Sequence, residues 1–236
     1  MDRVFSFIDL RAFAAQALPT ASASASWLAG RVELPLAPGP VSLSALKLAP
    51  GSGEVPPLPG DEFVLVLTGS LTLMAGGASV TLGPDQAALV PRGLPLAWKA
   101  KAGATALVMR SAEPGAAGAD KVVAIDTAAP LTPSGAPLAD LLLTPTPSCR
   151  NHTDYLSGSG VFIAGTWDST PYHRRAMRYR HFELMLLLQG SVTFVDGAGR
   201  EGTFTKGDIF LVEQAAECSW ESREQVAKIY AIHRPV

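Results

Sequence analysis

Apolar residues occur along the chain in short runs of about four to eight positions, some continuous and some alternating with polar residues. Clusters of Gly, Pro, Asp and Ser separate these runs. Short runs with a period of two are typical of β-strands, whereas the longer period of an amphipathic helix is nearly absent. Only residues 10–18 predict a short helix, which we expect to end before Pro19. The pattern therefore predicts an all-β fold.

Two short glycine-rich segments have the composition of hairpin turns between such strands. They are Asp196-Gly-Ala-Gly199 and Ala75-Gly-Gly-Ala78. Longer stretches rich in Pro and Gly, at 114–119 and 128–147, are typical of a linker and of a surface loop. The first of these stretches places a predicted domain boundary near residue 118.

The same series of strands and turns occurs twice in the chain. Glu62-Phe-Val-Leu-Val-Leu-Thr-Gly69 matches Glu183-Leu-Met-Leu-Leu-Leu-Gln-Gly190, and the strands that follow, 70–74 and 191–195, match each other as well. A repeat of roughly 120 residues is too long for a solenoid and indicates a duplicated domain. We therefore expect two domains, residues 1–118 and 119–236.

Composition and charge narrow the functional classes. Of the 236 residues, 47% are hydrophobic, which is enough for a globular core. Charged residues make up 17%, whereas about 25% is usual for globular domains. The low charge predicts that a second copy covers part of the surface, as in a homodimer. A net charge of −2 provides no basic surface for nucleic acid, and no apolar stretch is long enough for a membrane span.

Cysteine usage and the N-terminus predict a cellular location. Cys149 and Cys218 are the two cysteines, and they lack the spacing of a zinc ribbon or a thioredoxin motif. The N-terminal residues include charges where a signal peptide needs an unbroken apolar segment. Both features predict a cytoplasmic protein.

The repeated order of motifs resembles that of the cupin superfamily. Each half has a Glu followed after six residues by a Gly, and then an acidic turn and an apolar run. The second half is most similar to the group of ureidoglycine aminohydrolase-like and ethanolamine-utilisation cupins, through Gly165-Thr-Trp-Asp168, Tyr179-x-x-x-Glu183, Gly207-Asp208, Cys218-Ser-Trp220 and Lys228-x-Tyr230. The resemblance implies a bicupin, that is, two tandem double-stranded β-helix (RmlC-like jelly-roll) barrels, and a homodimer.

The residues that bind metal in cupins are replaced in this chain. The resemblance places two His before the Glu of the first motif and one His in the second motif. Met177, Tyr179 and Cys218 occupy these positions in the second half, and Pro56, Leu58 and Leu96 occupy them in the first half. We therefore predict no metal and no other cofactor. An alternative set of His181, Glu183 and Cys218 remains open and would favour zinc.

The segment 172–183 holds the most polar and aromatic residues of the chain. With a period of two, Arg175, Tyr179, His181 and Glu183 would share one face, and the cupin pattern makes that face the barrel interior. Glu183 then needs a charged partner, for which Lys228 is the candidate. The predicted ligand-binding residues are Trp167, Arg175, Tyr179, His181, Glu183, Cys218, Trp220, Lys228 and Tyr230.

The sequence leaves three functions open. The first is a metal-free protein that binds a small polar metabolite, a carboxylate or an amide, in the C-terminal barrel. The second is a metal-dependent C–N hydrolase resembling ureidoglycine aminohydrolase, and the third is a structural or regulatory dimerisation protein. The sequence leaves open whether the protein is an enzyme, and the alternative for each candidate residue is a purely structural role. Around Glu62 the sequence is apolar, so we expect a structural or dimer-forming N-terminal barrel.

Overall fold

A computed structural model describes residues 4–235 and has an all-β fold, as the sequence predicts. The described chain forms two compact units, which differ from two consecutive halves. We call residues 12–125 together with 154–164 the N-terminal barrel, and residues 4–11, 126–153 and 165–235 the C-terminal barrel. The predicted boundary near residue 118 stays a prediction.

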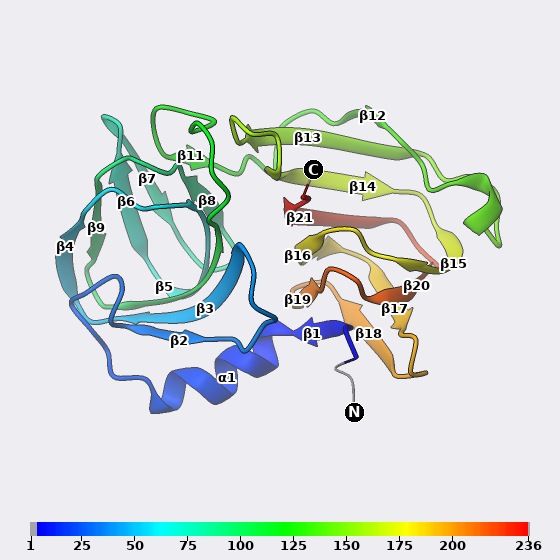
Figure 1. The fold of residues 1–236 in the computed structure, drawn as a ribbon, viewed down its shortest axis with the longest axis horizontal. Helices are drawn as coiled ribbons and strands as arrows, with labels where there is room; N and C mark the ends of the chain where they lie inside the picture. Colours follow the sequence, from blue (N-terminus) through cyan, green and yellow to red (C-terminus); the bar gives the residue numbers. More distant parts are fainter. Residues whose placement is uncertain (1–3, 236) are drawn as a thin grey trace. The chain divides into compact units, whose positions relative to one another are not determined.

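The N-terminal barrel consists of a six-stranded and a four-stranded antiparallel sheet (Figure 1). The strand orders are β11-β8-β5-β10-β3-β2 and β4-β9-β6-β7. Its strands are β2 (Arg31–Glu33), β3 (Val41–Leu48), β4 (Gly51–Val55), β5 (Asp61–Gly69), β6 (Leu71–Ala75), β7 (Ala78–Leu82), β8 (Ala87–Val90), β9 (Leu96–Ala100), β10 (Ala104–Ser111) and β11 (Val123–Ala124).

The C-terminal sheets have the orders β1-β19-β16-β21-β14-β13-β12 and β15-β20-β17-β18. The tip of the β13–β14 hairpin, residues 154–164, belongs to the N-terminal barrel. The strands are β1 (Phe7–Asp9), β12 (Thr132–Ser134), β13 (Cys149–Leu156), β14 (Phe162–Ser169), β15 (Tyr172–Arg178), β16 (Phe182–Gln189), β17 (Ser191–Val195), β18 (Glu201–Thr205), β19 (Ile209–Val212), β20 (Glu217–Ser222) and β21 (Val226–His233), with a short 3-10 helix, η1 (Ala139–Leu141), in the loop after β12.

The turns and the helix follow from local sequence. Gly76 and Gly77, between β6 and β7, have φ of 60° and 75°, as a type I′ hairpin turn requires. Asp196 organises the turn after β17 by accepting hydrogen bonds from the backbone N–H groups of Ala198 and Arg200. The predicted helix is present as α1 (Leu10–Thr20), but its predicted end was wrong, because it continues through Pro19 in its last turn. Pro19 has no N–H to donate to the carbonyl four residues earlier, so the helix passes through it without that hydrogen bond.

Each barrel has its own apolar core. In the N-terminal barrel, Trp27, Leu46, Val64, Leu73 and Trp98 are among the buried residues that fill the space between the sheets. In the C-terminal barrel the core is more aromatic, and it includes Phe7, Tyr172, Phe194, Phe204, Phe210 and Trp220. The alternation along β5 and β16 turns Glu62 and Glu183 to the same side as these core residues. Both carboxylates therefore face a barrel interior.

Candidate functional site in the C-terminal barrel

A buried ion pair lies on the inner side of the seven-stranded sheet. Glu183 on β16 accepts a hydrogen bond from the ammonium of Lys228 on the adjacent strand β21, with 2.8 Å between Lys228 Nζ and Glu183 Oε1. The two side chains are only 8% and 9% exposed. The same ammonium lies 3.2 Å from Sδ of Met185, which faces inward two residues after Glu183. The predicted partnership of Glu183 and Lys228 is therefore present in the structure.

His181 extends the ion pair toward the solvent. Its Nε2 lies 3.3 Å from Oε2 of Glu183, and its side chain is 13% exposed. Burial by itself would raise the pKa of Glu183, but the ammonium of Lys228 and the hydrogen bond from His181 hold that pKa well below its usual range. Glu183 is therefore an ionised carboxylate at neutral pH, with a partner on each oxygen.

Aromatic rings surround the ammonium of Lys228. Its Nζ lies 4.6 Å from the ring centroid of Trp167 and 5.2 Å from that of Trp220. These two indoles meet edge to face with their centroids 6.0 Å apart, and Tyr172 stacks on Trp220 at 5.5 Å. Because a ring face attracts a cation, the rings stabilise the buried charge, and they also provide flat apolar walls.

A β-bulge in β15 changes which arginine faces the barrel interior. The register with β20 shifts between Arg174, which pairs with Trp220, and Met177, which pairs with Cys218. The extra residue reverses the alternation at this point, so Arg174 is inside and 4% exposed whereas Arg175 is exposed. The prediction that Arg175 faces inward was wrong for this reason, because a strict period of two does not anticipate a bulge.

Arg174 is held by neutral groups. Its Nη1 donates to the backbone carbonyls of Cys218, at 2.8 Å, and of Arg175, at 3.2 Å, and its Nη2 donates to the hydroxyl of Tyr179 at 2.7 Å. The guanidinium lies 5.3 Å from the Tyr179 ring centroid. Within residues 4–235 it forms no ion pair with a carboxylate. Arg174 is thus a buried positive charge without a negative partner in the described chain.

The remaining predicted residues have different positions. Tyr179 is buried, and burial raises the pKa of its hydroxyl, so it stays protonated. Tyr230 is buried on β21, and its hydroxyl lies 3.3 Å from the Thr153 hydroxyl. Cys218 is fully buried, and burial raises the pKa of its thiol to about 11. A thiol with this pKa is a poor nucleophile at neutral pH, so Cys218 serves as a packing residue.

The donor set does not fit the metal that the cupin pattern implies. Within the part of the chain that the structure describes, no three His, Cys, Asp or Glu side chains come close enough to hold a metal ion. The inward carboxylate Glu183 is instead neutralised by the ammonium of Lys228. His181 contacts Glu183, but the thiol of Cys218 does not complete a set of three ligands with them. We derive no metal chemistry for this barrel.

Sequence reasoning missed a second buried cluster, around Glu62 in the N-terminal barrel. Arg31 donates to both carboxylate oxygens at 2.9 and 2.8 Å, and Arg110 donates twice to Oε1 at 2.8 and 2.7 Å. Nε1 of Trp27 adds a bond of 2.9 Å. Glu62 is fully buried, and although burial raises its pKa, the two arginines lower it below the usual value. The alternation along β10 could have predicted that Arg110 faces inward, and in the structure it pairs directly with Glu62.

Comparison with known proteins agrees with this architecture. The family model described as an EutQ-like cupin domain matches residues 156–230. The C-terminal part of the chain is therefore similar to cupin domains. A comparison with curated proteins found no match.

Solved structures of similar fold cover nearly the whole chain. A protein of unknown function from Pseudomonas syringae pv. tomato is 29% identical, with a TM-score of 0.81 and 86% of each chain covered. A cupin 2 conserved barrel domain protein from Leptotrichia buccalis is 9% identical, with a TM-score of 0.59 and coverage of 99% of this chain and 98% of the other. A variant of salicylate 1,2-dioxygenase from Pseudoaminobacter salicylatoxidans is 13% identical, with a TM-score of 0.57 and coverage of 98% and 84%.

No helix among residues 4–235 is long and apolar enough to cross a membrane. The cytoplasmic location stays a prediction.

Proposed function

We propose that this cupin protein binds a small carboxylate-bearing metabolite inside the C-terminal barrel, without a metal ion. The observation that carries the proposal is Arg174, a buried guanidinium that has no carboxylate partner within residues 4–235. A buried charge is costly unless an opposite charge compensates it. An anionic ligand would supply the missing charge.

The chemistry of arginine favours a carboxylate over the amide that the sequence left open. Three of the guanidinium's contacts go to two carbonyls and one hydroxyl, which leaves further N–H donors on a group that has five. Guanidinium and carboxylate pair through parallel hydrogen bonds and opposite charges, whereas an amide offers the hydrogen bond alone. The charge of Lys228 is already compensated by Glu183, so Arg174 is the group that selects an anion.

The surrounding residues suit a small, flat or short ligand. Trp167, Trp220 and Tyr172 form a continuous aromatic surface beside the two positive groups. His181 is a partly exposed polar group of the cluster, and it would donate a hydrogen bond to the ligand or accept one from it. In this proposal the ion pair of Glu183 and Lys228 fixes the polar floor, and the rings supply apolar contact. No catalytic step is assigned.

A thermal-shift screen tests the proposal. Benzoate, salicylate and short aliphatic carboxylates are compared with the amides of the same skeletons. At 100 times its dissociation constant a true ligand adds about 2.7 kcal/mol of stability, which is easily detected. We expect a carboxylate to shift the melting temperature and its amide to shift it much less. Equal shifts from both members of each pair, or no shift from any carboxylate, would overturn the proposal.

Two variants connect the binding to the site. Arg174→Lys keeps the charge but removes the fork of donors, and His181→Ala removes the partly exposed imidazole; each should weaken carboxylate binding about tenfold. The matched control is Arg150→Gln, since the exposed Arg150 guanidinium in the same barrel is paired with Asp168 at 2.5 Å. Unchanged carboxylate affinity in both site variants would contradict the assignment of the site.

The homodimer also remains a proposal. It rests on the low proportion of charged residues, 17%, and light scattering of the purified protein decides it. A mass of a single 24.7 kDa chain would contradict it.

A further inference from the structure

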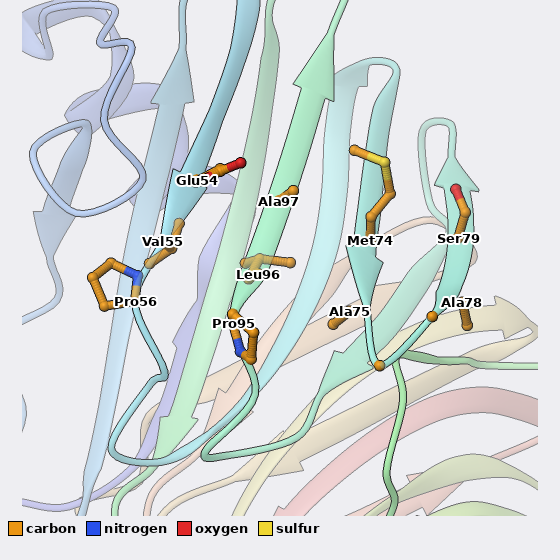
Figure 2. A pocket seen from close by; sticks show the side chains of 12 residues that line it. Glu54, Val55, Pro56, Met74, Ala75, Ala78, Ser79, Pro95, Leu96 and Ala97 are labelled. Carbon is orange, nitrogen blue, oxygen red and sulfur yellow. The ribbon is translucent and has the colours of Figure 1, made fainter.

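A groove lies on the four-stranded sheet of the N-terminal barrel, and its lining includes none of the residues of the Glu62 cluster. Its volume is about 820 Å³, within the range of about 300 to 1,000 Å³ that small-molecule sites have. All of its lining residues belong to β4, β6, β7, β9 and the adjoining turns. Figure 2 shows these side chains spread across the four strands.

One row of cross-strand neighbours explains the hollow. Glu54 pairs with Ala97, Ala97 pairs with Met74, and Met74 pairs with Ser79. Val55, next to Glu54, points into the barrel core, so this row lies on the outer face of the sheet. The methyl group of Ala97 leaves a gap in the middle of the row, and Figure 2 shows Glu54 and Met74 reaching toward it from either side.

The lining has an apolar body and a single charge. Met74, Ala97, Pro56 and Pro95 present apolar surface, and Met is a side chain that adapts to ligand shape. Glu54 is exposed and forms no hydrogen bond or ion pair with any other residue in the range 4–235. It is the one charged residue of the lining. A free carboxylate beside an apolar hollow is complementary to a cation that carries an apolar group.

We propose that this groove binds a small organic cation, an ammonium group attached to an apolar body. The ammonium would pair with the carboxylate of Glu54, and the apolar body would lie over Ala97 against Met74 and the two prolines. This site is independent of the carboxylate site in the other barrel, and the two sites have opposite charge preferences. The proposal therefore stands or fails separately from the function proposed above.

Methionine methyl signals in NMR locate the binding, because the methionines are well distributed. Met74 lines the groove, Met109 is fully buried, and Met177 and Met185 belong to the C-terminal barrel. Protein with ¹³C-labelled methionine methyl groups is titrated with benzylamine, and separately with benzyl alcohol, which has the same ring and no charge. We expect benzylamine to shift the Met74 signal and to leave the other three in place. Benzyl alcohol should bind more weakly.

Two variants and one control complete the test. Glu54→Gln removes the charge and should weaken benzylamine binding about threefold, because an exposed ion pair is weakened by the surrounding water. Ala97→Leu fills the hollow and should abolish the Met74 shift. Glu201→Gln, which changes an exposed glutamate in β18, should bind like the unaltered protein. Shifts confined to Met177 and Met185, equal affinity for benzyl alcohol, or full binding by Ala97→Leu would each overturn the proposal.

Discussion

Glu62 and Glu183 occupy equivalent positions in the two barrels and are both ionised and buried, but their partners differ in kind. Two arginines and an indole N–H saturate Glu62 with five hydrogen bonds, and the residue is fully enclosed. Glu183 has one ammonium and one partly exposed imidazole, with aromatic rings around them. The equivalent glutamate thus belongs to a closed structural network in the N-terminal barrel and to a candidate binding site in the C-terminal barrel.

The contrast shows two ways in which a barrel accommodates an inward carboxylate. In each barrel a side-chain cation compensates the charge, either guanidinium or ammonium. The guanidinium groups of Arg31 and Arg110 use the acceptor sites of both oxygens of Glu62. The ammonium of Lys228 is a smaller group, and the faces of Trp167 and Trp220 stabilise its charge in addition to Glu183.

The largest effect is expected from removing the charge of Glu62. Glu62→Gln leaves two arginines without their counter-charge, and breaking a buried pair in this way costs about 3 to 5 kcal/mol of unfolding free energy. Urea unfolding followed by tryptophan fluorescence measures the loss. Carboxylate binding in the C-terminal barrel should be unchanged in the folded variant. A loss no greater than that of the exposed control Glu201→Gln would contradict a structural role for the cluster.

A smaller loss is expected from Lys228→Met. The variant leaves Glu183 with His181 as its partner, and since His181 is partly exposed we expect a loss of about 1 to 3 kcal/mol. The double variant Lys228→Met with Glu183→Gln should recover much of it, because neither buried charge remains. Urea unfolding of the two single variants and the double variant gives the coupling energy. Strictly additive losses would show that the two side chains are not coupled.

The smallest effect is a difference in pH dependence. The folded-state pKa of Glu183 lies below its ordinary value of 4.5, so its contribution to stability is complete above about pH 4.5 and is lost as the pH falls below that value. Glu183→Gln removes this contribution. Between pH 5 and pH 3 its unfolding free energy should therefore fall less steeply than that of the unaltered protein. The control Glu201→Gln should keep the original slope, and a Glu183→Gln slope equal to it would contradict the ionised state of Glu183.

Much of the fold could be predicted because local rules determine it. The period of two, the glycine turns and the duplication identified the strands, and the inward parity of Glu183 and Lys228 held along regular strands. The bulge at 174–177 was not predictable, because nothing in the sequence pattern marks it. It makes Arg174, and not Arg175, face the barrel interior. The Glu62 network was missed because Arg31 and Arg110 are distant in sequence and meet only through strand pairing.

The distribution of tryptophans allows a direct test of the central claim, that the C-terminal barrel is the one that binds a carboxylate. Trp27 and Trp98 belong to the N-terminal core, whereas Trp167 and Trp220 lie beside Lys228. The measurement is the set of four indole N–H signals in a ¹⁵N NMR spectrum, recorded while the best carboxylate of the screen is added. We predict that the Trp167 and Trp220 signals shift and saturate together while those of Trp27 and Trp98 stay in place. Shifts confined to Trp27 and Trp98, or no shift in any of the four at saturating ligand, would contradict the account.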